Sequence, residues 1–142
     1  MPKEAGRQLE NALLQSFTHA AAMRAQPTHL DIELTHACQL ACQHCYNVDR
    51  EWTTPRLQEA CMSRETLSRV LGEAASLGVM KLGLTGGEPT LYPDIEGVIR
   101  EAKHLGFWVS LKTHGVLSSR RLHALWDAGL NRIVVSLHGL AK

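Results

Sequence analysis

Residues 29–45 read HLDIELTHACQLACQHC, an apolar run followed directly by three closely spaced cysteines. The run His29–Leu34 predicts a β-strand, so the cysteines lie in the loop that leaves it. Cys38, Cys42 and Cys45 follow the pattern C-x-x-x-C-x-x-C. This spacing allows three thiolates to converge from one loop on a single inorganic centre.

The number of cysteines in this loop bears on the kind of centre that it holds. A structural zinc ion takes four protein ligands in a closed shell. A cubane iron–sulfur cluster has four irons, so three thiolates leave one iron free for another ligand, which suits catalysis better than simple electron storage. The fourth cysteine, Cys61, stands apart from the other three. That distribution is typical of metal binding and not of a disulfide framework.

The composition is that of one globular domain, with 142 residues, 44% of them hydrophobic and 20% charged. The formal net charge is +1, and the only tight basic cluster is Arg120 with Arg121, so no nucleic-acid partner is indicated. The amino-terminal residues lack the apolar stretch of a signal peptide, and no window approaches the length of a membrane span. We therefore expect a cytoplasmic protein with no membrane partner.

Residues 1–27 predict a helical segment that precedes the main domain. Its apolar residues recur at steps of three and four between residues 3 and 24, at Leu9, Leu13, Phe17 and Ala20. Pro27 ends this pattern. We expect an amphipathic helix that packs against the outside of a domain formed by residues 28–142.

Beyond this segment, short apolar stretches alternate with helical patterns. The predicted strands are His29–Leu34, Val79–Leu84, Phe107–Leu111 and Arg132–Leu137. The predicted helices, each followed by a glycine, are Arg64–Leu77, Asp94–Leu105 and Ser119–Ala128. Glycine commonly stops a helix because it adopts the left-handed conformation without a steric clash. The repeated unit predicts an α/β fold in which neighbouring strands run parallel.

Every chemically suggestive segment follows a predicted strand. In parallel α/β folds, ligands gather at the carboxyl ends of the strands. The loops at these ends are the cysteine loop, Thr85–Pro89, Thr113–Gly115 and Ser136–Gly139. An isolated Gly-Gly-x-Pro would be an ordinary turn, but its place at a strand end favours a ligand site at a mouth shared by four loops.

These residues resemble the signatures of the radical S-adenosylmethionine enzymes. Cys38, Cys42 and Cys45 match the family's C-x-x-x-C-x-aromatic-C loop, with His44 at the aromatic position. Gly86–Pro89 reproduces the family's Gly-Gly-Glu-Pro stretch unaltered, in the right order along the chain. The resemblance covers about residues 28–139 and implies a partial TIM-like (βα) barrel, with about four βα units present.

The resemblance implies two cofactors and a reaction. The three loop cysteines would hold a [4Fe-4S] cluster whose unique iron chelates S-adenosylmethionine. Reduction of the cluster would cleave S-adenosylmethionine to methionine and a 5′-deoxyadenosyl radical, which abstracts hydrogen from a substrate. The difficult chemistry belongs to the cofactors, while the protein orients them and excludes water and oxygen.

The resemblance also implies which residues bind S-adenosylmethionine. Glycines let backbone carbonyls approach a ligand closely, and Glu88 offers an anionic acceptor to the methionine ammonium group. His44 is expected to pack near the adenine, and Tyr46 either shields the cluster or belongs to the core. The expected contacts of the second motif are Gly86, Gly87, Glu88 and Pro89.

The third and fourth loops depart from the family pattern. Thr113 and Ser136 are expected to contact the cofactor. Many members carry Thr-Asn-Gly and Ser-x-Asp-Gly in these loops, where this chain has His114 and His138. We interpret both histidines as polar loop residues and not as proton donors.

A non-catalytic zinc module is the alternative to a radical enzyme. Imidazole is a common zinc ligand, so the three loop cysteines could bind zinc together with His36, His44 or Cys61. A zinc module does not require Gly86–Pro89 farther along the chain, which favours the cluster. The iron content would distinguish the two sites.

The four predicted strands are fewer than the family's core usually contains. We expect a truncated chain, with a split enzyme and a degenerate protein as alternatives. The isolated chain would then bind a cluster after anaerobic reconstitution but cleave S-adenosylmethionine poorly. The stretch Cys42–Asn47 looks like members that modify peptides or assemble cofactors, the SPASM-type maturases. The expected partners are therefore a peptide or small-molecule substrate, a small electron-donor protein and a completing polypeptide.

Overall fold

Within the part of the chain that the structure describes, four strands form one sheet in the order β1-β2-β3-β4, and each neighbouring pair is parallel. The structure is a computed structural model that describes residues 11–13, 15–16, 19–20, 22–23, 26–45 and 61–137. The strands are β1 (His29–Thr35), β2 (Lys81–Gly86), β3 (Trp108–Thr113) and β4 (Arg132–Val135). The predicted parallel α/β arrangement is confirmed.

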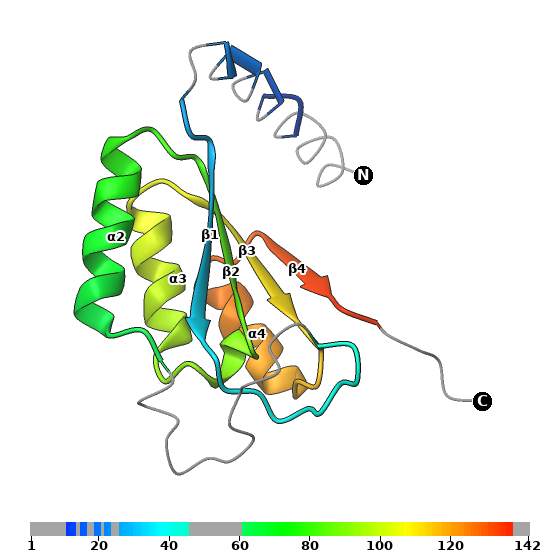
Figure 1. Cartoon of the computed structure of the whole chain (residues 1–142). Helices are drawn as coiled ribbons and strands as arrows, with labels where there is room; N and C mark the ends of the chain where they lie inside the picture. Colours follow the sequence, from blue (N-terminus) through cyan, green and yellow to red (C-terminus); the bar gives the residue numbers. More distant parts are fainter. Residues whose placement is uncertain are drawn as a thin grey trace.

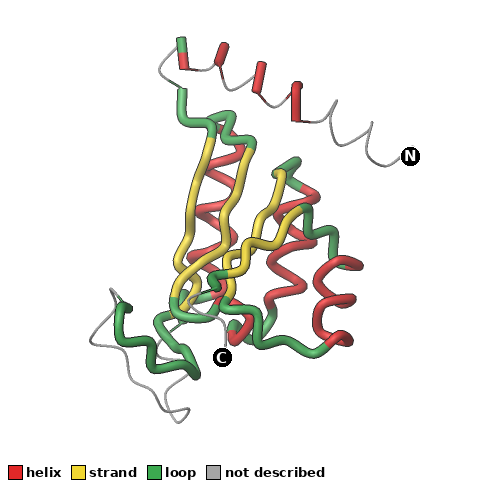
Figure 2. The backbone as a smooth tube through the Cα atoms, turned by 90° about the vertical axis from the view of Figure 1, so that its right-hand side faces the viewer, coloured by secondary structure: helices red, strands yellow, loops and turns green. Residues whose placement is uncertain are grey.

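Three α-helices connect the strands and lie on one side of the sheet (Figures 1 and 2). They are α2 (Arg64–Ser76), α3 (Ile95–His104) and α4 (Ser119–Asp127), and a short 3₁₀ helix, η2 (Pro89–Leu91), follows β2. The glycines after the three helices, Gly78, Gly106 and Gly129, have φ values of 82°, 90° and 103°. This left-handed backbone confirms them as helix stops.

Several strands end at other residues than the sequence predicts, because strand pairing decides where they end. β2 ends at Gly86 and β3 at Thr113, each two residues beyond the predicted end, whereas β4 ends at Val135. Lys112 and Thr113 pair with Val134 and Val135. The ladder thus continues through polar residues that apolar patterning does not mark as strand.

The apolar core occupies the space between the sheet and its helices. Alternate strand residues, such as Leu34, Leu84 and Leu111, are fully buried there. They pack with helix residues that include Leu67 and Ile99. Because successive side chains of a strand point to opposite faces, the polar residues between them lie on the other face of the sheet. That second face is therefore available for a site.

The described residues of the amino-terminal segment are helical at positions 11–13, 15–16, 19–20 and 22, and all of them are exposed. Leu13 is 51% exposed, so its expected packing on the outside of the domain is not observed. Leu9 and Phe17 lie outside the described residues. A helical period predicts an amphipathic face but not what covers it.

Within the described ranges, no helix has the length and apolar character needed to cross a membrane.

Replacement of the fully buried Leu82 by alanine tests the core that supports the sheet. We expect Leu82→Ala to lower the free energy of unfolding by about 2–5 kcal/mol, because it leaves a cavity under the central strands. The exposed Leu77 provides a matched control, and Leu77→Ala should change this free energy by only about 0.5 kcal/mol. Urea denaturation measures both, and equal effects would contradict the described core.

Candidate active site

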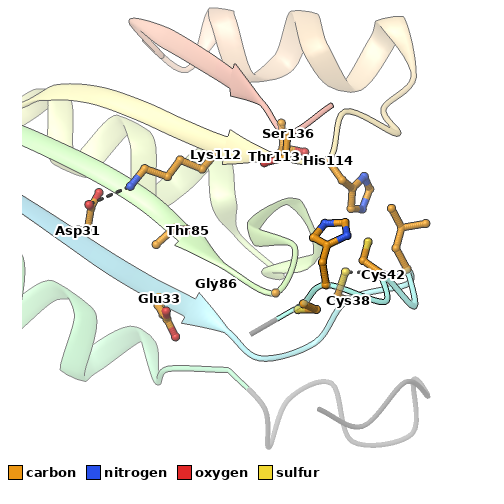
Figure 3. Close-up of a pocket in the computed structure, with 14 residues that line it drawn as sticks. Asp31, Glu33, Cys38, Cys42, Thr85, Gly86, Lys112, Thr113, His114 and Ser136 are labelled. Atoms are coloured by element: carbon orange, nitrogen blue, oxygen red, sulfur yellow. Dashed lines mark hydrogen bonds and ion pairs between the residues drawn. The ribbon is translucent and has the colours of Figure 1, made fainter. Parts of the chain in front are cut away.

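A cavity of about 560 Å³ lies at the carboxyl ends of the strands, on the face of the sheet opposite α2, α3 and α4 (Figure 3). All four strand-end segments that the sequence analysis selected contribute to its lining. The predicted residues in this lining are Cys38, Cys42, His44, Cys45, Gly86, Gly87, Thr113 and Ser136. Tyr46 and His138 lie outside the described residues.

Backbone hydrogen bonds attach the glycine turn after β2 to the start of the cysteine loop after β1. The Gly87 N–H donates to the Thr35 carbonyl over 2.7 Å, and the Glu88 N–H donates to the Ala37 carbonyl over 2.8 Å. Thr35 also caps the loop, because its Oγ1 accepts from the Ala37 N–H at 3.0 Å. The residues just before Cys38 are thereby fixed against the turn.

This attachment requires glycine at both positions of the turn. A Cβ atom at Gly86 would overlap the Thr35 carbonyl oxygen, and one at Gly87 would overlap the Ala37 carbonyl oxygen. Gly86 also has a φ of 128°, which side chains disfavour. The sequence predicted a close approach of these glycines to a ligand. The structure adds a close approach to the cysteine loop itself.

The Glu88 side chain points into the protein and not into the cavity. It is fully buried, and its two oxygens lie 2.9 Å from the Thr113 hydroxyl, which donates to them. Further donors are the N–H and hydroxyl of Thr90 and the N–H of His114. These bonds offset the cost of burying a carboxylate. Glu88 thus joins the glycine turn to the end of β3, a role that the sequence analysis missed. The neighbouring Pro89, also buried, begins η2.

His114 packs as part of this buried network, with a side chain only 9% exposed. Its Nδ1 accepts from the Val116 N–H at 3.1 Å, so the proton of a neutral ring is on Nε2. Nε2 lies 3.1 Å from Glu88 Oε2 but is not aligned for a hydrogen bond. The ring therefore lies beside the buried carboxylate and is itself part of the cavity lining. It is a loop histidine, as expected, but a largely buried one.

The three loop cysteines carry free thiols that line the same cavity. Cys38 is buried and its Sγ accepts from the Leu40 N–H at 3.5 Å. The Cys45 N–H donates to the Cys42 carbonyl at 3.1 Å and turns the loop. Within the described part of the chain, no three histidine, cysteine or acidic side chains are placed to share one metal ion.

Cys61 belongs to a different part of the structure. It forms an isolated antiparallel bridge with Thr35 and lines a separate pocket with Tyr92 and Asp94. The alternative of a single zinc ion held by the loop cysteines and Cys61 therefore finds no support in this geometry.

Three charged residues on the cavity side of the sheet were not selected from the sequence. They are Asp31 and Glu33 on β1 and Lys112 on β3. Lys112 Nζ lies 2.8 Å from Asp31 Oδ2. Burial raises the pKa of Asp31, but the hydrogen bonds and charges of Lys112 and His29 outweigh this and lower the pKa below 3.8. The alternation of β1 could have indicated its two acids, whereas the pairing with Lys112 depends on the fold.

The sequence model of the Radical SAM superfamily matches residues 32–142, which include both motifs. The chain belongs to the radical SAM superfamily. It is 40% identical to the PqqA peptide cyclase of Methylorubrum extorquens strain PA1 over 118 residues, and 41% identical to that of Methylobacterium nodulans over 112 residues. These stretches cover 80% and 78% of this chain but only 29% and 28% of the relatives.

Solved structures of Streptococcus suis SuiB share the fold. The complex of SuiB with S-adenosylmethionine has a TM-score of 0.63 and 24% identity, and the match covers 90% of this chain and 30% of SuiB. The complex with the precursor peptide SuiA has a TM-score of 0.64, with 92% and 29% covered. The expected partial-barrel architecture is confirmed.

Membership of this superfamily gives the chain a [4Fe-4S] cluster and S-adenosylmethionine as cofactors. The described side chains fit such a cluster. Three thiols on one loop face one cavity. Three cysteine ligands on a cubane leave its fourth iron free for another ligand.

Replacement of Gly87 by alanine tests the attachment between the two motifs. The added Cβ would collide with the Ala37 carbonyl and push the cysteine loop away. We expect Gly87→Ala to lower the free energy of unfolding by about 1–3 kcal/mol and to reduce the iron bound after anaerobic reconstitution.

Gly72 in α2 is the matched control, because its Cβ would meet no atom within 4 Å. Gly72→Ala should raise the free energy of unfolding by about 0.4–1 kcal/mol and leave iron binding unchanged. Normal stability and iron content in Gly87→Ala would show that the two motifs are not coupled in this way.

Proposed function

We propose that this chain forms the cofactor-binding part of a radical SAM enzyme that modifies a peptide. The observation that carries the proposal is the fixed attachment of the three-cysteine loop to the Gly86-Gly87 turn at one cavity. A peptide substrate is supported by the relatives named PqqA peptide cyclase and by the complex of SuiB with the precursor peptide SuiA.

In this proposal, Cys38, Cys42 and Cys45 hold the cluster, and the backbone of Gly86 and Gly87 binds the ammonium group of S-adenosylmethionine. When bound, the cofactors supply the electron transfer and radical chemistry by which the family abstracts hydrogen from a substrate. The protein holds the cysteine loop and the glycine turn next to each other and limits the access of water to the cofactors.

Glu88 supports the same site from beneath. Its carboxylate accepts hydrogen bonds from Thr113 and Thr90 and keeps the turn against β3. It also places a negative charge in a region of low dielectric directly after Gly87, which favours a cation at the turn. We also assign contacts with S-adenosylmethionine to His44, Tyr46, Thr113 and Ser136 in this proposal.

Residues 28–142 constitute the core domain in this proposal, and residues 1–27 a helical segment before it. The chain spans under a third of the length of its curated relatives, so the complete enzyme would include further elements, on the same or on a completing polypeptide. The outer edge of β4, where Val135 is exposed, is a place where a further strand could pair.

A small electron-donor protein would reduce the cluster in this proposal. The clustering of three cysteines on one loop, which is typical of metal binding and not of a disulfide framework, suits a cytoplasmic location.

Anaerobic reconstitution tests the proposed function. The wild-type chain should bind about four irons. After reduction of the cluster with dithionite, its electron paramagnetic resonance spectrum should change when S-adenosylmethionine is added, because the unique iron is accessible. Replacement of any one loop cysteine by serine should remove most of this iron.

Cys61→Ser is the matched control and should retain the cluster, because Cys61 lies in a separate pocket. About one zinc per chain in place of iron, or a loss of iron in Cys61→Ser equal to that in Cys42→Ser, would contradict the proposed function.

A further inference from the structure

An ion pair crosses the cavity side of the sheet, below the level of the cofactor loops. Lys112 on β3 reaches over β2 to Asp31 on β1, with 2.8 Å between Nζ and Oδ2 (Figure 3). Gly83 is the residue of β2 that pairs with Asp31. A Cβ at Gly83 would overlap Asp31 Oδ1, so the absence of a side chain there makes room for the pair.

Stability does not explain this arrangement. The two side chains are 42% and 44% exposed, and ion pairs that exposed contribute little to folding. Glycine in the interior of a strand weakens the strand, because it costs backbone entropy and packs no side chain. Strands of a parallel sheet are also usually apolar on both faces. Glycine at position 83 therefore weakens the packing of β2 but leaves room for two charged side chains that face the cavity.

The contacts of the pair assign different roles to its members. Both oxygens of Asp31 are engaged, Oδ2 by Lys112 and Oδ1 by His29 Nε2 at 3.2 Å. The lowered pKa of Asp31 keeps it charged near neutral pH. An ammonium group has three N–H donors, and within the described part of the chain the bond from Lys112 to Asp31 uses one of them. Lys112 therefore has donor capacity beyond its bond to Asp31, and it lines the cavity.

We propose that Lys112, positioned by Asp31, binds a carboxylate group in the cavity. A fixed ammonium with remaining donors is suited to a carboxylate, which accepts charge-assisted hydrogen bonds. Two sources have this chemistry: the methionine carboxylate of S-adenosylmethionine, and an acidic side chain or carboxyl terminus of a peptide substrate. The proposal rests on the proposed function, because both ligands belong to it.

The test compares Lys112→Met with Lys112→Arg and with a control, Lys81→Met. Lys81 is a half-buried lysine of β2 that is not part of the cavity lining. In one arm, the affinity of the reconstituted and dithionite-reduced chain for S-adenosylmethionine is measured by electron paramagnetic resonance. In the other, the chain without cluster is titrated with N-acetylglutamate methylamide by NMR, and N-acetylglutamine methylamide serves as the neutral probe.

We expect Lys112→Met to weaken binding about tenfold or more in at least one arm, while Lys112→Arg retains most of it and Lys81→Met matches the wild type. Asp31→Asn should weaken the same arm less, because it releases Lys112 without removing its charge. A loss in the first arm identifies the cofactor carboxylate. A loss confined to the glutamate probe identifies the substrate.

Equal binding by Lys112→Met and Lys81→Met in both arms would overturn the proposal. The melting temperatures of the variants separate a binding effect from unfolding, and Lys112→Arg keeps the test valid if the methionine variant is unstable. Failure of the wild-type chain to bind S-adenosylmethionine would instead count against the proposed function, and the glutamate arm would still test Lys112.

Discussion

Two backbone hydrogen bonds, from the amides of Gly87 and Glu88 to the carbonyls of Thr35 and Ala37, hold the cofactor site together. They extend the pairing of β1 and β2 past the end of the strands, into loops that would otherwise be separate. The bonds form only because no side chain at Gly86 or Gly87 keeps the two backbones apart. The glycines thus serve two purposes: they leave space for a ligand, and they fix the segment that leads into the cysteines.

The division of the sheet into two chemically different faces gives this attachment its setting. Alternate residues of each strand bury apolar side chains under α2, α3 and α4, and this core carries most of the stability. The opposite face can then be polar. Its cavity holds the thiols of the cysteine loop at one end and the Asp31–Lys112 pair at the other. On the buried side, the carboxylate of Glu88 accepts a hydrogen bond from Thr113 and so links the turn after β2 to the end of β3.

Local patterns were sufficient to predict the elements of the fold but not the contacts between them. The strands, the helices and the glycine stops follow from periodicity and backbone preference, which are properties of short segments. The inward orientation of Glu88 depends on Thr113 and His114, more than twenty residues later in the chain, and the Asp31–Lys112 pair crosses an intervening strand at Gly83. Such contacts arise from the packing of distant segments, so no window of sequence shows them. The exposure of the described residues in the amino-terminal helix likewise does not follow from the helical period.

Amide hydrogen exchange of Gly87 and Glu88 measures the attachment between the two motifs in the unmodified chain. If these amides are bonded as described, their exchange should be slowed to a degree comparable with that of Leu84 in the interior of β2, because release requires local opening of the β1–β2 pairing. Exchange of both amides at the rate of an unprotected loop, with Leu84 still protected, would contradict this account of how the site is assembled.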